Sequence, residues 1–230
     1  MKKLLHLIFI VLCVSSISVL SADTTTILAF GDSITAKGGR GFVTYRHVLI
    51  PELRNECLDF EFIGPKRDHD SAYAGYGGKN TSYLLSISEE VYSQYPADIV
   101  MIHSGHNSFS KDDPVAGIVR DTELIMKNMR SINPDVIFLL AQVIPAGKLP
   151  KYSYIPDLNE ELAALATRLT EQGYNIILVD QADGFDWKED TISDMVHPNP
   201  SGAKKMADKW MQALLPLLDI KDVKLVEADS

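Results

Sequence analysis

The sequence has few cysteines, and it contains no internal repeat, low-complexity tract or linker rich in proline, glycine and serine. Its 230 residues include two cysteines, Cys13 and Cys57. Cys13 falls in an N-terminal segment that we expect to be removed, which leaves no pair to form an internal disulfide. We therefore expect no disulfide framework, and we expect Cys57 to be a buried and inert thiol.

Basic residues are also scarce relative to acidic ones. The 22 lysines and arginines face 31 aspartates and glutamates, which gives a formal net charge of −9. If Lys2 and Lys3 are removed with the N-terminal segment, 20 basic residues remain and the charge becomes −11. Nucleic acids and anionic membrane surfaces attract proteins through basic patches. The composition therefore argues against either of them as the main partner.

The N-terminus carries the features of a secretory signal peptide. Two lysines precede an apolar stretch from Leu4 to Leu20, and Ser21-Ala22 supplies a small-residue cleavage site. The alternative is an uncleaved membrane anchor, although the apolar stretch is at the short end for a membrane span. We predict a signal peptide over residues 1–22 and a single domain over residues 23–230. The mature protein would then be secreted or periplasmic, without stable membrane insertion.

Five short apolar runs recur along the chain at the spacing of strands in an α/β protein. Several are continuous stretches of valine, isoleucine and leucine, which is typical of parallel strands covered on both faces. Helical patterns separate them, so we predict a three-layer α/β/α sandwich with a five-stranded parallel sheet. The predicted strands are Ile27–Phe30, Phe60–Ile63, Asp98–His103, Val136–Val143 and Asn175–Val179.

Three of the helical patterns carry an apolar stripe that we expect to pack against the sheet. The first of these helices begins at Asp113-Pro114, a pair typical of an N-cap and a first helical residue. The segment 222–227 is either an edge strand or a loose tail. The stripes consist of Ile118, Ile125, Met129 and Ile132; of Leu158, Leu162, Leu165 and Leu169; and of Ala203, Met206, Ala207, Trp210, Met211 and Leu214.

Ser33 follows the first apolar run, at the carboxyl end of a predicted strand, where open α/β sheets bind their ligands. Near the other end of the chain, Asp194 and His197 supply a carboxylate and an imidazole three residues apart. A serine hydroxyl becomes an effective nucleophile when an imidazole takes its proton and a carboxylate orients that imidazole. The three residues together predict covalent hydrolysis, whereas an isolated Gly-Asp-Ser would be a turn or a helix cap.

Two further segments supply donors for the oxyanion of a tetrahedral intermediate. Gly75–Asn80 precedes a helical pattern, and Ser104–Ser108 follows the third apolar run. The Gly78 backbone N–H and the Asn107 side-chain amide are the natural donors, because glycine lets the backbone approach a ligand and asparagine is neutral at every pH. The Ser33 N–H is a third candidate.

Other polar residues near these segments have structural interpretations. We expect Asp32 to form hydrogen bonds within its turn, and the two histidines His103 and His106 to pack or to orient substrate. The cluster Asp68-His69-Asp70 lacks further ligands at regular spacing, so we predict an exposed polar loop rather than a metal site. Pro198 removes His197 from helical geometry and is expected to begin the following helix.

At these residues the chain resembles the SGNH (GDSL-type) hydrolases, whose name states the four residues Ser, Gly, Asn and His. The matching positions are Ser33, Gly78, Asn107 and His197, and Asp194 matches the family's acid. The similarity runs from about Ile27 to Trp210. Finer features resemble the carbohydrate-esterase branch, including family 3 acetylxylan esterases. Those features are Phe42-Val43-Thr44-Tyr45-Arg46, Phe60-Glu61-Phe62-Ile63-Gly64-Pro65, Gly75-Tyr76-Gly77-Gly78, Ala141-Gln142-Val143-Ile144-Pro145 and Val196-His197-Pro198-Asn199.

The resemblance implies a flavodoxin-like fold and an exported serine esterase that removes short acyl groups, such as acetyl, from carbohydrate. The partner would be an acylated carbohydrate or another small ester, and neither a metal nor an organic cofactor is expected. Two positions depart from the family pattern. Ser108 stands where the third block usually has aspartate, which we expect to affect loop stability. Lys79 stands where carbohydrate-esterase relatives often carry an aromatic residue or aspartate.

Two other functions remain open at this level. The first keeps the same catalytic residues but takes longer acyl chains, as a lipase, lysophospholipase or thioesterase does. The second is a non-catalytic carbohydrate-binding protein on a decayed hydrolase fold, and the presence of Ser33, Asp194 and His197 argues against it. The sequence leaves the oligomeric state open.

Overall fold

The computed structural model of the protein describes residues 24–39, 41–69, 71–109 and 114–219. The predicted signal peptide and the segment 222–227 lie outside these residues. The strands are β1 (Thr25–Gly31), β2 (Phe60–Ile63), β3 (Lys66–Asp68), β4 (Ser71–Gly75), β5 (Ile99–His103), β6 (Ile137–Gln142) and β7 (Asn175–Asp180). The helices are α1 (Arg46–Asn55), α2 (Thr81–Gln94), α3 (Pro114–Ile132), α4 (Ile155–Glu171), α5 (Trp187–Asp190) and α6 (Pro200–Leu214), followed by the short 3-10 helix η1 (Leu215–Leu217).

A single sheet built around β1 forms the centre of the molecule. Within the described residues it has seven strands in the order β3-β4-β1-β5-β6-β7, and β2 also pairs with β1. The strands β2, β1, β5, β6 and β7 run parallel to their neighbours. These are the five strands that the apolar runs predict, so the predicted parallel sheet is confirmed.

The sequence did not predict β3 and β4. β2 pairs with the first half of β1, whereas β4 pairs with Phe30 and Gly31 at its end, and β3 runs antiparallel to β4. β3 is wholly polar, and β4 consists mostly of small residues, so neither shows the apolar pattern of a strand. Because β4 ends beside Gly31, the loop that follows it lies next to Ser33.

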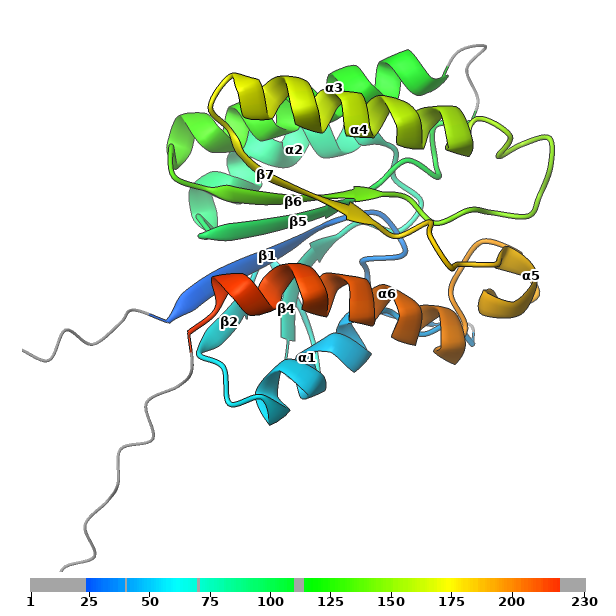
Figure 1. Ribbon diagram of the computed structural model, residues 1–230, viewed down its shortest axis with the longest axis horizontal. Coiled ribbons are helices and arrows are strands. Elements are labelled where there is room, and N and C mark those ends of the chain that lie inside the picture. The colour runs from blue at the N-terminus through cyan, green and yellow to red at the C-terminus, as the bar shows by residue number, and fades with distance from the viewer. Residues whose placement is uncertain (1–23, 40, 70, 110–113, 220–230) are drawn as a thin grey trace, which may run out of the picture.

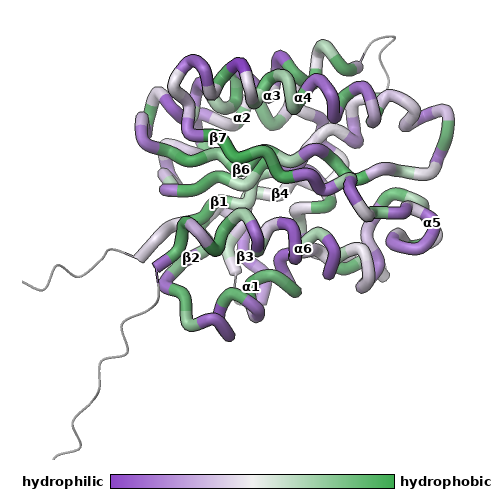
Figure 2. The backbone as a smooth tube through the Cα atoms, viewed as in Figure 1, coloured by the Kyte–Doolittle hydropathy of each residue, from purple (hydrophilic) through white to green (hydrophobic). Residues whose placement is uncertain are grey.

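Helices cover both faces of the sheet, as Figure 1 shows. Along β1, Leu28 and Phe30 join the core beneath α2, α3 and α4, whereas Ile27 and Ala29 join the core beneath α1 and α6. All four side chains are buried. The hydrophobic colouring along the central strands in Figure 2 reflects this burial on both faces. The predicted three-layer α/β/α sandwich is therefore confirmed.

The predicted apolar stripes pack into these two cores with one exception. The stripes of α4 and α6 are buried, apart from the half-buried Met211. In α3, Ile118, Ile125 and Met129 are buried, but Ile132 is 36% exposed. Ile132 is the last residue of the helix, where the side chain is no longer enclosed between helix and sheet, so its assignment to the stripe was wrong. Asp113, the predicted N-cap, lies outside the described residues.

Cys57 lies at the surface, in the turn that follows α1. Its thiol is exposed, and its backbone has a positive φ of 55°. The expectation of a buried thiol was wrong, because the turn carries this residue away from both cores. Among the helices of the described residues, none is both long enough and apolar enough to cross a membrane.

Candidate active site

Ser33 lies in the turn that follows β1, at the carboxyl edge of the sheet. Gly31 ends the strand in close contact with β5, since a Cβ atom there would lie 2.3 Å from the carbonyl oxygen of His103. Only glycine allows the two backbones to approach this closely. Asp32 then accepts a hydrogen bond from the Ile34 N–H at 3.0 Å. This bond fixes the turn and leaves Ser33 half-buried.

A second loop, between α5 and α6, carries Asp194 and His197. Asp194 Oδ1 accepts hydrogen bonds from the backbone N–H groups of Val196 and His197, both at 2.9 Å. Met195 between them has a φ of 58°, and its carbonyl accepts a hydrogen bond from the Gly147 N–H at 2.7 Å. The acid therefore holds its own loop in shape with one oxygen, and the other oxygen remains for the imidazole.

The helix that follows this loop begins later than the sequence indicated. Asn199 is the N-cap of α6, and its Oδ1 accepts a hydrogen bond from the Gly202 N–H at 3.1 Å. Pro200 is the first helical residue, and Pro198 stays in the loop. The predicted start at Pro198 was wrong, because a capping side chain and a second proline occur directly after it.

The structure brings Ser33, His197 and Asp194 together, although the serine and the histidine lie 164 positions apart in the sequence. His197 Nδ1 lies 2.6 Å from Asp194 Oδ2, and His197 Nε2 lies 2.8 Å from Ser33 Oγ. A ring nitrogen that faces a carboxylate carries the proton, so Nε2 accepts the hydrogen bond from the serine hydroxyl. This arrangement can move the hydroxyl proton to the imidazole while the serine oxygen attacks a carbonyl.

Asp194 is held in its ionised form. Partial burial raises the pKa of its carboxyl group, but hydrogen bonds from the backbone N–H and the imidazole of His197, together with one from Val196, outweigh that effect. The net result is a pKa below the usual value for aspartate. A negative charge is therefore present to orient the imidazole and to stabilise its protonated form.

The two predicted oxyanion donors outside the nucleophile turn, Gly78 and Asn107, belong to connected loops. Asn107 Nδ2 donates a hydrogen bond to the Lys79 carbonyl at 3.0 Å. The Lys79 N–H in turn donates to the Tyr76 carbonyl at 3.1 Å and closes a tight turn in which Gly78 has a φ of 72°. That backbone conformation favours glycine at position 78. Because an amide nitrogen carries two hydrogens, Asn107 retains a second N–H for a ligand.

Backbone contacts place this turn beside Ser33. The Tyr76 N–H donates a hydrogen bond to the Gly31 carbonyl at 2.9 Å. A Cβ atom at Gly77 would lie 4.0 Å from the Cβ atom of Ser33. The Gly77-Gly78 turn and Ser33 are therefore neighbours at the carboxyl edge of the sheet. The bond from Asn107 to Lys79 connects the loop after β5 to them.

Three buried titratable residues lie between these loops and the core. Burial raises the pKa of Asp32 and lowers the pKa values of His103 and His106. The two imidazole rings stack with their centroids 5.7 Å apart, and His106 Nε2 donates a hydrogen bond to the Ile144 carbonyl at 2.8 Å. Burial therefore favours the uncharged form of both imidazoles, and the bond from His106 to Ile144 helps to hold the loop that carries Asn107.

Phe42 contacts one of the catalytic candidates, His197, and the sequence analysis assigned it no role in the site. Its ring stacks on the His197 imidazole, with centroids 4.5 Å apart and an angle of 29° between the planes. The one signal in the sequence was its place in the segment Phe42–Arg46 that resembles the carbohydrate esterases, because a phenylalanine between predicted elements otherwise looks like an ordinary packing residue.

The expectation of an exposed polar loop is correct for His69, which is exposed, and wrong for Asp68. Asp68 is the last residue of β3 and is buried, and its Oδ2 lies 2.9 Å from Nη2 of the equally buried Arg46. Arg46 also donates to Ser71 Oγ at 2.6 Å and to the Thr35 carbonyl at 2.8 Å. The expectation failed because the neutralising partner lies 22 residues away in the sequence. Asp70 lies outside the described residues.

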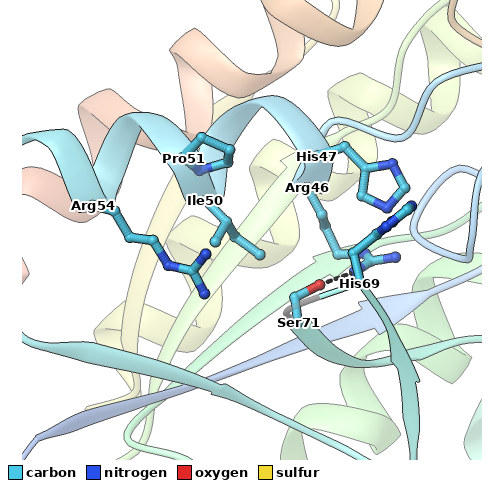
Figure 3. Close-up of a pocket in the computed structure, with 7 residues that line it drawn as sticks. All are labelled: Arg46, His47, Ile50, Pro51, Arg54, His69 and Ser71. Atoms are coloured by element: carbon cyan, nitrogen blue, oxygen red, sulfur yellow. Dashed lines mark hydrogen bonds between the residues drawn. The ribbon is translucent and has the colours of Figure 1, made fainter.

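A cavity of about 300 Å³ opens beside this ion pair, and Figure 3 shows the residues around it. None of the three residues Ser33, Asp194 and His197 lines it. Its lining residues are Arg46, His47, Ile50, Pro51, Arg54, His69 and Ser71. In the part of the chain that the structure describes, no group of three or more histidine, cysteine, aspartate or glutamate residues is arranged to hold a metal ion.

Several solved structures share this fold. The family 3 carbohydrate esterase of Clostridium thermocellum is 21% identical, with a TM-score of 0.72 over 84% of this chain and 96% of its own. The family 3 carbohydrate esterase from Talaromyces cellulolyticus is 20% identical, with a TM-score of 0.73 over 87% of this chain and 100% of its own. The lipase/acylhydrolase from Enterococcus faecalis is 17% identical, with a TM-score of 0.68 over 86% of this chain and 100% of its own. Among curated proteins, none matches the sequence.

The sequence itself gives the more specific comparison. The model of the GDSL-like Lipase/Acylhydrolase family matches residues 29–205, a stretch that includes all five predicted catalytic and oxyanion residues. The resemblance to SGNH hydrolases that the sequence indicated is thereby confirmed. The chain belongs to the GDSL-like lipase/acylhydrolase family.

Proposed function

We propose that this ester hydrolase is an exported serine esterase that removes short acyl groups, such as acetyl, from carbohydrate. The observation that supports the chemistry most directly is the hydrogen-bonded chain from Ser33 through His197 to Asp194, with spacings of 2.8 and 2.6 Å. The residue types, their order and their contacts are those that nucleophilic acyl transfer requires.

In the first half-reaction, Ser33 Oγ attacks the ester carbonyl carbon while His197 Nε2 takes the hydroxyl proton. The new C–O bond forms, and the electron pair of the carbonyl moves to its oxygen. When that intermediate collapses, the bond to the sugar oxygen breaks and His197 returns the proton to the departing alcohol. A water molecule then attacks the acyl group on Ser33 by the same route and releases the carboxylic acid.

The negative charge of the tetrahedral intermediate needs hydrogen-bond donors that are already in place. We assign this role to the backbone N–H groups of Ser33 and Gly78 and to the second amide N–H of Asn107. Each such donor contributes about 3–4 kcal/mol to transition-state stabilisation. The hydrogen bond from Asn107 to Lys79 supports the assignment, because it fixes two of these donors relative to one another.

Two observations support carbohydrate as the substrate class, namely similar structures and the openness of the site. Two of the similar structures are described as family 3 carbohydrate esterases. The site is also open, since the side chains of His197 and Asp194 are 22% and 32% exposed. An open site can accept an ester group that projects from a bulky carbohydrate. Acetate release from acetylated xylan, pectin, mannan and sialic acid would identify the preferred carrier, and release from none of them would contradict a carbohydrate substrate.

The nucleophile is tested by Ser33→Ala. Because no other group can form the acyl-enzyme, we expect the variant to lose the release of p-nitrophenol from its acetate ester and to lose labelling by a fluorophosphonate probe. Ser86→Ala is the matched control, since Ser86 is exposed on α2 and, within the part of the chain that the structure describes, its hydroxyl bonds only to the Tyr83 carbonyl of its own helix. Full activity of Ser33→Ala would refute the assignment, and an unlabelled wild-type protein would indicate a non-catalytic function.

Acyl-chain length separates the proposed function from that of a lipase or thioesterase. We expect kcat/KM to fall from the acetate to the butyrate to the decanoate ester of p-nitrophenol. A clear preference for decanoate would show that the enzyme acts on longer acyl chains.

Export completes the proposal. We infer that residues 1–22 direct secretion or transfer to the periplasm and are then removed, a segment that lies outside the described residues. N-terminal sequencing of the exported protein should give Asp23 as its first residue. A protein that retains Met1 and stays with the membrane would be anchored instead.

A further inference from the structure

Phe42 covers one face of the imidazole that serves as the proposed base. The ring centroids of Phe42 and His197 lie 4.5 Å apart, and the two planes differ by 29°. Phe42 itself is half-buried, in the loop between β1 and α1. The contact therefore joins a residue near the nucleophile turn to a residue near the start of α6.

Backbone and side-chain hydrogen bonds hold the loop of Phe42 against both halves of the site. The Phe42 N–H donates to the Gly39 carbonyl at 3.0 Å and closes a turn. The next residue, Val43, donates its N–H to the carbonyl of Pro198 at 3.2 Å, directly after His197 in the chain. Thr44 is buried, and its hydroxyl donates to the Ile34 carbonyl at 3.1 Å, directly after Ser33. The ring is thus placed by its neighbours on either side.

We propose that Phe42 is a positioning residue that sets the orientation of His197 and stabilises the imidazolium formed when the Ser33 proton is transferred. This inference rests on the proposed function, because it assumes that His197 is the base. The face of an aromatic ring carries partial negative charge and attracts a cation placed against it. His197 is neutral before the attack on the ester and cationic in the transition state.

The positive charge on His197 appears only during proton transfer, and this determines which kinetic constant Phe42 affects. Because the attraction is stronger in the transition state than in the ground state, it raises kcat and leaves substrate binding almost unchanged. A residue that contacts the substrate directly would instead change KM or the preference for acyl-chain length. A residue that only fills space would act through stability. The three roles therefore predict different measurements.

The decisive variants are Phe42→Leu, which removes the ring but keeps an apolar side chain, and Phe42→Tyr, which keeps the ring. We expect kcat for p-nitrophenyl acetate to fall about fivefold in Phe42→Leu with KM unchanged. Phe42→Tyr should keep kcat within about twofold of the wild type, because the ring face is retained. Phe42→Met provides a second ring-free variant if the leucine variant folds poorly, and it should show the same loss.

Phe60→Leu is the matched control. Phe60 is another half-buried phenylalanine, on β2, whose ring packs edge-to-face against Phe62 with centroids 5.9 Å apart. The same substitution there removes an aromatic contact without touching His197. Its kcat should equal that of the wild type, and circular dichroism with thermal unfolding should show that all variants are folded.

The rate at which a fluorophosphonate labels Ser33 gives a readout that does not depend on the natural acyl group. This reaction also needs His197 to take the serine proton as the phosphorus–oxygen bond forms and fluoride leaves. We expect the labelling rate to fall by about the same factor as kcat in the ring-free variants.

The possible outcomes separate this inference from the proposed function. If the wild type hydrolyses esters and is labelled, but the ring-free variants match it in kcat and in labelling rate, Phe42 has no positioning role. A rise in KM without a fall in kcat would assign Phe42 to the substrate instead. If the wild type is neither active nor labelled at Ser33, the proposed function fails and this inference fails with it.

Discussion

The imidazole of His197 is held along its edge by two groups and across its face by a third. Asp194 contacts Nδ1, Ser33 contacts Nε2, and Phe42 stacks on one face of the ring. Asp194 sets the tautomer by holding the proton on Nδ1. The two edge contacts together restrict rotation of the ring within its plane, and the stacked Phe42 ring restricts its tilt out of that plane. In its proposed role as base, His197 then needs little reorganisation when it accepts a proton.

Asp194→Asn tests the first of these contacts. An amide is neutral and can present its NH₂ group to Nδ1, which favours the wrong tautomer and leaves the imidazolium without a counter-charge. We therefore expect kcat to fall about 10³–10⁴-fold while KM changes little. Because the pKa of Asp194 lies below its usual value, its carboxylate remains charged in moderately acidic solution. We therefore expect that protonation of Asp194 does not reduce the activity of the wild type down to about pH 5. Steady-state kinetics on p-nitrophenyl acetate between pH 5 and pH 8 would measure both.

A result within tenfold of the wild type would contradict the assignment of Asp194. Asp183→Asn is a suitable control, because Asp183 forms an exposed surface ion pair with Lys209 at 2.8 Å.

At the scale of secondary-structure elements, the parts that the sequence predicted are those with a local pattern. The five parallel strands and the stripes of α3, α4 and α6 each repeat apolar residues at their own period. Ser33, Asp194 and His197 could be selected from the sequence because a serine nucleophile requires an imidazole and a carboxylate as partners, and the structure brings these three side chains into contact. β3, β4 and the stack of Phe42 on His197 depend on contacts between distant segments, which no local pattern records. The buried charge of Asp68 was misread for the same reason.

The N-cap of α6 is an element whose strength can be measured. Asn199 Oδ1 caps the helix through Gly202, and Asn199 Nδ2 also donates to the carbonyls of Glu189 at 2.7 Å and Thr191 at 3.2 Å. Asn199→Ala removes all three bonds, and we expect it to lower the free energy of unfolding by about 1–2 kcal/mol. Thermal and urea unfolding would measure the loss.

Asn80→Ala is the comparison for this variant. Asn80 caps α2 through a single side-chain bond, from the Tyr83 N–H at 3.0 Å. Its loss of stability should be the smaller of the two. An Asn199→Ala variant as stable as the wild type would show that the two extra bonds and the cap contribute nothing.

At the scale of the whole molecule, the buried pair of Arg46 and Asp68 connects α1, β3 and the nucleophile turn. Arg46 reaches Asp68 and Ser71 on one side and the Thr35 carbonyl on the other. A charged group buried in this way is stable only while its partner is ionised. The pair therefore makes the stability of the protein sensitive to acid.

Asp68→Asn should destabilise the protein by about 3–5 kcal/mol at neutral pH, because it leaves a buried guanidinium without its counter-charge. Burial raises the pKa of Asp68, but hydrogen bonds from Arg46 and His47 outweigh it and hold the pKa below its usual range. The stabilisation is therefore complete above about pH 4, the pKa of the unfolded chain, and decreases as pH falls through the folded pKa. Urea unfolding from pH 7 to pH 3 should show the variant and the wild type converging in acid. A difference that is constant with pH would contradict this account.

The separation of 164 positions along the chain between Ser33 and His197 has a consequence for how the enzyme folds. Ser33 lies in the turn after β1 and His197 in the loop before α6, so a nascent or truncated chain that ends before His197 lacks the proposed base and is expected to be inactive. Contacts of such long range form late, after most of the loop-closure entropy has been lost. The recovery of esterase activity during refolding is therefore expected to report the arrival of the native state itself, with no active species before it.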